Sequence, residues 1–327
     1  MFKTLSGGFI LTVRKTQFVE RRIGLVGAID LEEYDFKVGS KTKVRATEGT
    51  IEERIPPRLK IRKEAKAEFS HIMISFDDET KSINEKLYEN RASYEKVYVF
   101  NLNMGGGHIE GYFIPDTDKI LDGFKSLSDS DRLIKKYGFL DEFIFSVGDG
   151  NHSLATAKTH WENVKKTLTE KERENHPARY AVCEFVNIYD EGIYFEPIHR
   201  FIKGVNVEDF TLKLQSANVG NITVYDGNND IVLTKNSSLP DTIKALDAFI
   251  KDYIEKFGGE IDYVHGEENG RNLVKAQNGV GVFLDKLDKS ELFKYVSKNG
   301  AFPRKTFSMG ENIEKRYYLE GSIIAND

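Results

Sequence analysis

The densest group of chemically useful side chains lies in the six-residue run at positions 148–153, which reads GDGNHS. It supplies a carboxylate at Asp149, an amide at Asn151, an imidazole at His152 and a hydroxyl at Ser153. These groups could donate hydrogen bonds to an oxyanion, hold a divalent cation through Asp149, or move a proton through His152. We therefore take this run as the first candidate site.

The residues around the run predict a strand followed directly by a helix. Residues 143–147 are mostly apolar, and helix formers follow at helical spacing over 154–161. Gly148 and Gly150 would form the turn between them. Because the first turn of a helix has unpaired N–H groups and partial positive charge, it favours a phosphate or a carboxylate. The alternative is a purely structural turn, since the same residues are good turn formers and N-caps.

A second candidate segment is VRATEGT at 44–50, with RIPPR at 54–58 close behind. Arg45 could hold a phosphate because guanidinium groups bind oxyanions bidentately. Glu48 could act as a general base or help to hold Mg²⁺. The two prolines predict that residues 40–63 are irregular, and a solvated loop is the alternative reading.

Three further segments carry candidate groups. PIHR at 197–200 places His199 and Arg200 at the end of an apolar strand, where a histidine is usually satisfied in the core. The C-terminal segment 303–316 offers Arg304 and Lys305 as phosphate contacts, although a solvent-facing basic segment explains it almost as well. MGGGH at 104–108 lacks the residues of a nucleotide-binding glycine loop and predicts a hairpin or a bulge.

The bulk composition indicates a soluble globular protein. The chain has 327 residues, of which 39% are hydrophobic and 30% charged. A net charge of −5 argues against a nucleic-acid partner, and no apolar stretch is long enough to span a bilayer. Cys183 is the one cysteine and lies in an apolar run, which predicts a buried thiol in a reducing, cytoplasmic environment.

The order of predicted elements indicates an α+β fold. Strands and helices alternate without strict βαβ regularity, and a smaller α/β unit begins near residue 204. We predict a core over residues 1–203 that carries the GDGNHS site, a smaller α/β unit over 204–298, and a C-terminal segment, 299–327, that returns to the core.

With these segments assembled, the chain resembles the bacterial and archaeal family called domain of unknown function 1015. The resemblance rests on five segments in order: RATEGT with RIPPR, MGGGH, VGDGNHSLATAK, EPIHR, and PRKTFSMGENIEKRYYLE. Members of this family are longer at the N-terminus, which implies that a further segment precedes the position of Met1.

The GDGNHS run also resembles the phosphate-binding box of the ParB and sulfiredoxin superfamily, which implies a mixed-sheet core of that type. Many members of the family carry a second histidine and an arginine at the corner, where this chain has Asn151 and Ser153. The superfamily includes an ADP-dependent free-serine kinase, CTP-binding partition proteins and an ATP-using sulfinic reductase. The resemblance therefore implies nucleotide or phosphate binding.

From these residues and resemblances we expect phosphoryl transfer, of the kinase or phosphatase type, on a small metabolite such as serine or phosphoserine. Gly148, Gly150, Asn151 and Ser153 would bind phosphate, together with Arg45, His199, Arg200, Arg304 and Lys305. His152, Glu48 and Asp149 would be catalytic, with ATP or ADP and Mg²⁺ as cofactors and Asp149 as a metal ligand. The expected partner is a nucleotide or a phosphorylated small molecule. The alternatives are a nucleotide-binding regulator without turnover and a metal-dependent hydrolase built on Asp149, His152 and His199.

Overall fold

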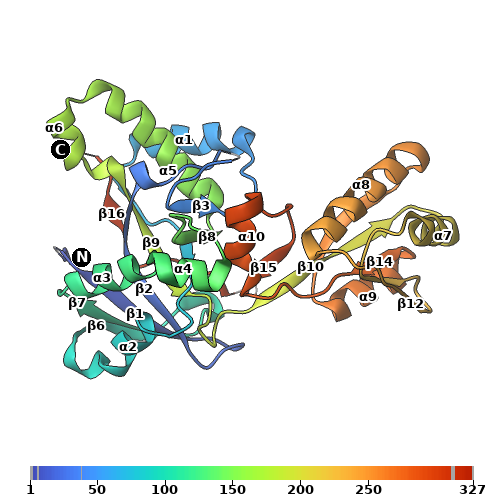
Figure 1. Cartoon of the computed structure of the whole chain (residues 1–327), viewed down its shortest axis with the longest axis horizontal. Helices are drawn as coiled ribbons and strands as arrows, with labels where there is room; N and C mark the ends of the chain where they lie inside the picture. Colours follow the sequence, from blue (N-terminus) through green and yellow to red (C-terminus); the bar gives the residue numbers. More distant parts are fainter. Residues whose placement is uncertain (1–2, 6, 38, 311–313, 326–327) are drawn as a thin grey trace. The chain divides into compact units, whose positions relative to one another are not determined.

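The chain forms two compact units, each built on its own sheet (Figure 1). The computed structural model describes residues 3–5, 7–37, 39–310 and 314–325. The first unit comprises Met1–Tyr194, Phe293–Ala301 and Glu311–Asp327, and the second comprises Phe195–Leu292 and Phe302–Gly310. Both units mix helices with strands, so the predicted α+β class is confirmed.

The first unit contains an eight-stranded mixed sheet with the order β3-β8-β5-β9-β2-β1-β7-β6. Most neighbours are antiparallel, but β3 runs parallel to β8 and β5 runs parallel to β9. As a result, β3 and β8 end at the same edge of the sheet. The strands are β1 (Phe9–Lys15), β2 (Arg22–Asp30), β3 (Val44–Ala46), β5 (Met73–Phe76), β6 (Glu95–Asn101), β7 (His108–Ile114), β8 (Phe145–Asp149) and β9 (Tyr180–Asn187).

Helices of the first unit are short, apart from the one that follows β8. They are α1 (Ile55–Glu64), α2 (Asn84–Glu89), α3 (Asp118–Ser126), α4 (Ser130–Tyr137), α5 (Asn151–Val164), α6 (Glu170–Glu174) and α10 (Glu291–Asn299). Helices α1 and α5 pack side by side (Figure 1). They run in the same direction, because Ile51 before α1 contacts His152, whereas Arg62 near the end of α1 acts electrostatically on His160. Both helices therefore begin at the same end of the pair.

One face of the large sheet carries the main hydrophobic core. Cross-strand register places Leu11 opposite Leu25, Leu25 opposite Phe185, and Ile74 opposite both Phe185 and Val147. All of these side chains are buried in one cluster, with residues of α3 and α5 packed against them. Because side chains alternate along a strand, this register fixes which residues point to the other face.

The other face of the sheet is unusually polar for a buried surface. In the pairing of β1 with β2, Arg14 lies opposite Arg22 and Thr12 lies opposite Gly24. In the pairing of β9 with β5, Glu184 lies opposite Met73. A Cβ atom on residue 24 would lie 2.2 Å from Oε1 of Glu184, so only glycine leaves room for this carboxylate. A short two-stranded sheet of β4 (Ala67–Glu68) and β16 (Ser322–Ile323) ties the C-terminal segment to this unit.

The second unit has a smaller sheet with the order β12-β11-β14-β10-β13, and β15 also pairs with β10. Its strands are β10 (Phe195–Lys203), β11 (Ile222–Tyr225), β12 (Asp230–Leu233), β13 (Glu260–His265), β14 (Val280–Phe283) and β15 (Phe307–Met309), and its helices are α7 (Val207–Ala217), α8 (Leu239–Phe257) and α9 (Glu267–Gln277). Residues 195–203 were expected in the first unit, but β10 pairs with β13 and β14 and belongs to the second.

The stretch 40–63, which we predicted to be irregular, contains strand β3 (Val44–Ala46) and nearly all of helix α1 (Ile55–Glu64). The two prolines occupy the first turn of this helix. Proline is tolerated there because the N–H groups of a first turn have no partner within the helix.

Helix α9 was not predicted either. Gly270 lies in its interior, where a side chain would collide with the ring of Phe283.

Candidate functional site

The predicted strand–turn–helix corner is present at the end of β8. Strand β8 ends at Asp149, Gly150 adopts a left-handed conformation with φ of 86°, and α5 begins at Asn151. A Cβ atom on residue 150 would lie 2.3 Å from the carbonyl oxygen of His71, so the close approach of the two backbones requires glycine. The N-cap residue of α5 is Gly150, which has no side chain to cap the helix. The N-cap position therefore lacks the usual side-chain acceptor.

The RATEGT segment lies beside this corner. Strand β3 pairs in parallel with β8, and the hydroxyl of Thr47 donates to the carbonyl oxygen of Val147 at 2.7 Å. The backbone N–H of Ile51 donates to Nε2 of His152 at 3.3 Å. Glu48 lies between these two contacts along the chain. Two segments about one hundred residues apart are thus joined at one edge of the sheet.

A shallow pocket opens at the end of β3. It encloses about 360 Å³ of empty space, its open mouth included. Its lining includes Asp35, Lys37, Ser40, Glu48 and Gly49. Glu48 is half-buried and contributes to the pocket wall, where a small ligand could reach its carboxylate. The pocket offers groups of both signs, which suits a polar ligand.

Asp149 is held by a histidine and a lysine that come from distant parts of the chain. Its Oδ2 lies 3.2 Å from Nε2 of His71 and 2.9 Å from Nζ of Lys315. Burial alone would raise the pKa of Asp149, but His71 and Lys315 hold it well below its usual range. Asp149 is therefore ionised at neutral pH. An ionised carboxylate beside Nε2 orients that nitrogen as a donor, which leaves Nδ1 of His71 facing away. Nδ1 has no hydrogen-bond partner among the described residues.

His152 is oriented by the loop that precedes α1. Because its Nε2 accepts the N–H of Ile51, the ring is deprotonated at that nitrogen. This hydrogen bond positions the ring of His152 and joins residues 47–51 to the start of α5. The predicted catalytic role of His152 stays a prediction.

A network of buried charges adjoins this corner on the polar face of the sheet. The carboxylate of Glu184 accepts hydrogen bonds from the hydroxyls of Thr12 and Tyr318, and Nη2 of Arg316 lies 3.7 Å from it. Burial alone would raise its pKa, but Arg316, Arg22 and the two hydroxyls lower the pKa of Glu184 to about 2. The ring of Tyr318 meets the ring of His71 edge-on, with centroids 5.2 Å apart. The network and the corner are therefore continuous through Tyr318.

Arg45 is engaged in a structural contact. Its guanidinium forms a bidentate ion pair with Asp141, and its Nε donates to the carbonyl oxygen of Thr42 at 2.8 Å. The side chain is 4% exposed and lies over the ring of Phe143. Arg45 therefore clamps the loop before β8, and although it also lines the pocket at the end of β3, its guanidinium is already paired with Asp141.

The remaining predicted phosphate ligands belong to the second unit. Arg200 is buried and forms a bidentate ion pair with Asp247, and it also donates to the carbonyl oxygen of Lys305 at 2.8 Å. Nδ1 of His199 accepts the N–H of Leu284, and burial lowers its pKa to about 4. Arg304 is exposed. Within this unit these residues serve packing and ion pairing, and their predicted role toward a phosphate stays a prediction.

The described part of the chain contains no group of three or more His, Cys, Asp or Glu side chains arranged to hold a metal ion. Asp149, the predicted metal ligand, is already paired with His71 and Lys315.

Cys183 is fully buried, as predicted, and burial raises the pKa of its thiol. No helix among the residues described is long and apolar enough to cross a membrane.

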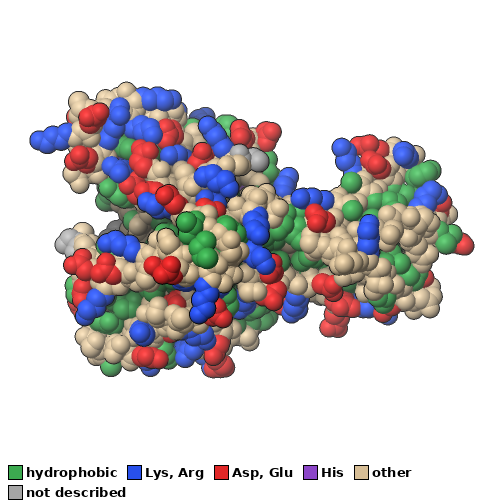
Figure 2. Space-filling view, in the orientation of Figure 1, with side chains coloured by type: hydrophobic (Ala, Val, Ile, Leu, Met, Phe, Trp, Pro, Cys, Tyr) green, Lys and Arg blue, Asp and Glu red, His purple; other side chains and the backbone are tan. Residues whose placement is uncertain are grey.

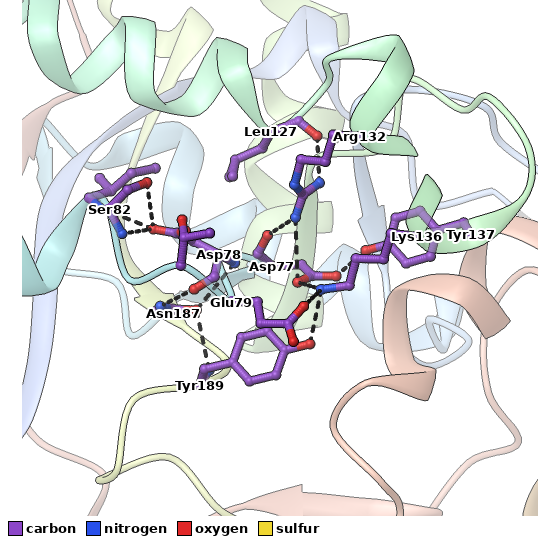
Figure 3. Close-up of polar contacts among 12 residues, drawn as sticks. Asp77, Asp78, Glu79, Ser82, Leu127, Arg132, Lys136, Tyr137, Asn187 and Tyr189 are labelled. Carbon is purple, nitrogen blue, oxygen red and sulfur yellow. Dashed lines mark hydrogen bonds and ion pairs between the residues drawn. The ribbon is translucent and has the colours of Figure 1, made fainter. Parts of the chain in front are cut away.

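A second polar cluster lies at the opposite end of β5 and involves α4 (Figure 3). Asp77 is buried and accepts hydrogen bonds from Lys136 and from the hydroxyl of Tyr137. Asp78 accepts the N–H groups of Ser82 and Ile83 and so stabilises the turn before α2. Because the carboxylates of both aspartates are used in these contacts, the cluster fastens α4 and the turn before α2 to the end of β5.

Charged side chains of both signs are interspersed on the face of the molecule shown in Figure 2. This distribution agrees with the small net charge and shows no basic patch on that face. One site residue that sequence reasoning missed is His71, because nothing near it in the sequence marks it. Lys315 lies in the basic C-terminal segment, but its pairing with Asp149 spans more than half of the chain.

Comparison with known proteins identifies a family and a set of distant structural neighbours. A family model described as "Protein of unknown function (DUF1015)" matches residues 3–249. No curated protein matches the chain.

Three of the similar solved structures cover most of the chain. A conserved hypothetical protein from Pyrococcus furiosus has a TM-score of 0.44 and 11% identity, over 91% of this chain and 95% of that one. A free serine kinase in complex with AMP has a TM-score of 0.47 and 9% identity, over 92% and 91%. SbnI with a C-terminal truncation, from Staphylococcus aureus, has a TM-score of 0.48 and 8% identity, over 91% and 87%. At these scores and identities, the functions of these proteins are not transferred to this chain.

Proposed function

This chain belongs to the DUF1015 family, and from its site we propose that it transfers a phosphoryl group to or from a small metabolite. The observation that carries the proposal is the start of α5 at a glycine N-cap, with Lys315 at the adjacent Asp149. A helix N-terminus and a cation together favour an oxyanion. The predicted resemblance of GDGNHS to a phosphate-binding box supports the same assignment.

The phosphate binds at the first turn of α5, with the amides of Asn151 and Ser153 as donors and Lys315 as the cation. Glu48 takes the proton of the attacking hydroxyl or water. The new oxygen–phosphorus bond forms as the bond to the leaving oxygen breaks, and the charge on the leaving group is balanced by Lys315. Phosphoryl transfer depends mainly on such positioning and charge stabilisation.

Mg²⁺ usually accompanies nucleotide phosphates and is held by one or two carboxylates together with phosphate oxygens. Glu48, in the pocket wall, fits that role better than Asp149, which is paired with His71 and Lys315. The ion would neutralise charge on the phosphates. Serine and phosphoserine, with ADP or ATP, are the first substrates to test because the sequence resemblance implies them.

The test is phosphorus NMR of purified protein mixed with serine and ATP or ADP, and separately with phosphoserine, in the presence of Mg²⁺. We expect turnover in one mixture and a loss of about 100-fold or more in Glu48→Gln. Glu53→Gln is the matched control, because Glu53 is exposed in the same segment. Nucleotide binding without turnover would replace the enzyme with a regulatory protein. Neither binding nor turnover would end the proposal for these substrates.

A further inference from the structure

Three arginines are buried together on the polar face of the large sheet. Arg14, Arg22 and Arg316 are 1%, 5% and 5% exposed, and all three act electrostatically with Glu184. All three guanidinium nitrogens of Arg14 make hydrogen bonds: Nε and Nη2 donate to the carbonyl oxygen of Gly106, and Nη1 donates to the carbonyl oxygen of Glu314. Arg14 is therefore a structural link between β1, the MGGGH loop and the C-terminal segment.

Arg22 and Arg316 do not use their donors in this way. Arg316 donates from Nη1 to Glu320 at 2.9 Å, but its Nε and Nη2 have no hydrogen-bond partner among the described residues. Nε of Arg22 is also buried without an acceptor in the described part of the chain. Buried donors are nearly always paired in folded proteins, and a guanidinium left without acceptors carries a desolvation cost. Both arginines act electrostatically on the carboxylate of Glu184. Oε1 of Glu184 accepts a hydrogen bond from the hydroxyl of Thr12 and not from either guanidinium.

Among anions, the charges of this cluster disfavour a dianion more than a monoanion. The positive charges of the three arginines are offset by the carboxylates of Glu184, Glu314 and Glu320, so the net charge of the cluster is close to zero. A phosphate dianion would add two uncompensated charges, whereas a carboxylate adds one. A planar carboxylate also matches the fork of N–H groups on a guanidinium.

We infer that Arg22 and Arg316 form a subsite for the carboxylate of the substrate whose phosphate binds at the start of α5. This inference rests on the proposed function. Lys315 and Arg316 are consecutive, and the first contacts Asp149 while the second contacts Glu184. Glu184 and Asp149 both pair with Met73, which places their backbones two strand spacings, about 10 Å, apart. One small molecule with a phosphate and a carboxylate could therefore contact both places.

The experiment compares two ligands that differ only in the carboxylate. Binding of 3-phosphoglycerate and of glycerol 3-phosphate to the full chain is measured by calorimetry at constant ionic strength. We expect the first to bind at least about tenfold more tightly than the second. Arg22→Lys keeps the charge but removes Nε and the fork, and it should abolish that difference while leaving the affinity for glycerol 3-phosphate unchanged. Arg54→Lys is the control, because Arg54 is exposed and makes no hydrogen bond or ion pair with Glu184, Arg22 or Arg316 among the described residues.

Urea unfolding of Arg22→Lys checks that the variant is folded, and Arg316→Lys provides a second test if it is not. Equal affinities of the wild type for the two ligands would overturn the subsite and leave the phosphate site standing. Binding of 3-phosphoglycerate alone, sensitive to Arg22→Lys, would support the subsite and count against phosphate binding at α5. If neither ligand binds, both the subsite and the phosphate site are wrong.

Discussion

His71 makes two separate contacts with the turn after β8, although it lies 78 residues before Asp149. Its Nε2 lies 3.2 Å from the Asp149 carboxylate, and its carbonyl oxygen occupies the space next to the α-carbon of Gly150. The side chain of His71 thus fixes the charge at the corner, and its backbone fixes the shape. Disturbing either contact should affect both the stability and the ligand binding of the corner.

Replacing Asp149 with asparagine should make the protein less sensitive to acid. Because the folded protein holds the pKa of Asp149 below its usual value, the ionised carboxylate stabilises the fold above a pH of about 4, and this stabilisation is lost as the pH falls further. We expect Asp149→Asn to lower the free energy of unfolding at pH 7 by about 1–3 kcal/mol and to reduce the loss between pH 5 and pH 3. Urea unfolding at several pH values measures this. Asp116→Asn, at an exposed position, is the control, and equal pH slopes for the wild type and Asp149→Asn would contradict the prediction.

Gly150→Ala should destabilise the protein more than Gly138→Ala. Both glycines have φ near 80°, but an added Cβ meets the backbone of His71 at 2.3 Å at position 150 and nothing within 4 Å at position 138. Gly138→Ala should cost about 1 kcal/mol from backbone strain alone. Gly150→Ala should cost about 2–4 kcal/mol and should also weaken phosphate binding, because the start of α5 must shift. Thermal unfolding and phosphate titration of the two variants test this, and equal effects would show that the close approach is unimportant.

His160 should make the protein less stable in mild acid. Burial, with Arg62, Lys63 and His176 nearby, lowers its pKa to about 4, so the unfolded chain binds a proton more readily than the folded one. His160 should therefore contribute a loss of roughly 2 kcal/mol in stability as the pH drops from about 6.5 to about 4, and His160→Gln should remove that part of the total loss. The free energy of unfolding across this range gives the result. His108→Gln, at a side chain 42% exposed, should retain the wild-type pH dependence.

Arg45→Lys should reduce stability without changing phosphate affinity. Lysine cannot reproduce the bidentate pair with Asp141 or the bond to Thr42, so we expect a loss of about 1–3 kcal/mol in the free energy of unfolding. Phosphate affinity should match the wild type, since the guanidinium is already occupied. A loss of phosphate affinity in a variant that unfolds like the wild type would restore Arg45 as a phosphate ligand.

Local patterns predicted most of the strands and the strand–turn–helix corner, because alternation, glycines and helix formers act over a few residues. The parallel pairing of β3 with β8 accounts for the adjacency of RATEGT and GDGNHS. Helix α1 was missed because two prolines look like a break when their position in the first turn is not known. The sequence did not predict with which residues the charged side chains of the site would pair. Asp141 takes up Arg45, and His71 reaches Asp149, over separations that only the sheet topology defines.

The C-terminal segment 314–320 contacts the buried polar face of the large sheet, and this has a consequence for how the protein is made. Glu314 to Glu320 provide the groups that meet Arg14 and Glu184, and they follow the whole second unit in the chain. A ribosome therefore releases residues 195–310 before the segment that neutralises the buried charges of β1 and β9. The first unit reaches its final state only after residues 314–320 have been made, and a chain that stops before residue 314 would leave the Glu184 carboxylate without Arg316 and Tyr318.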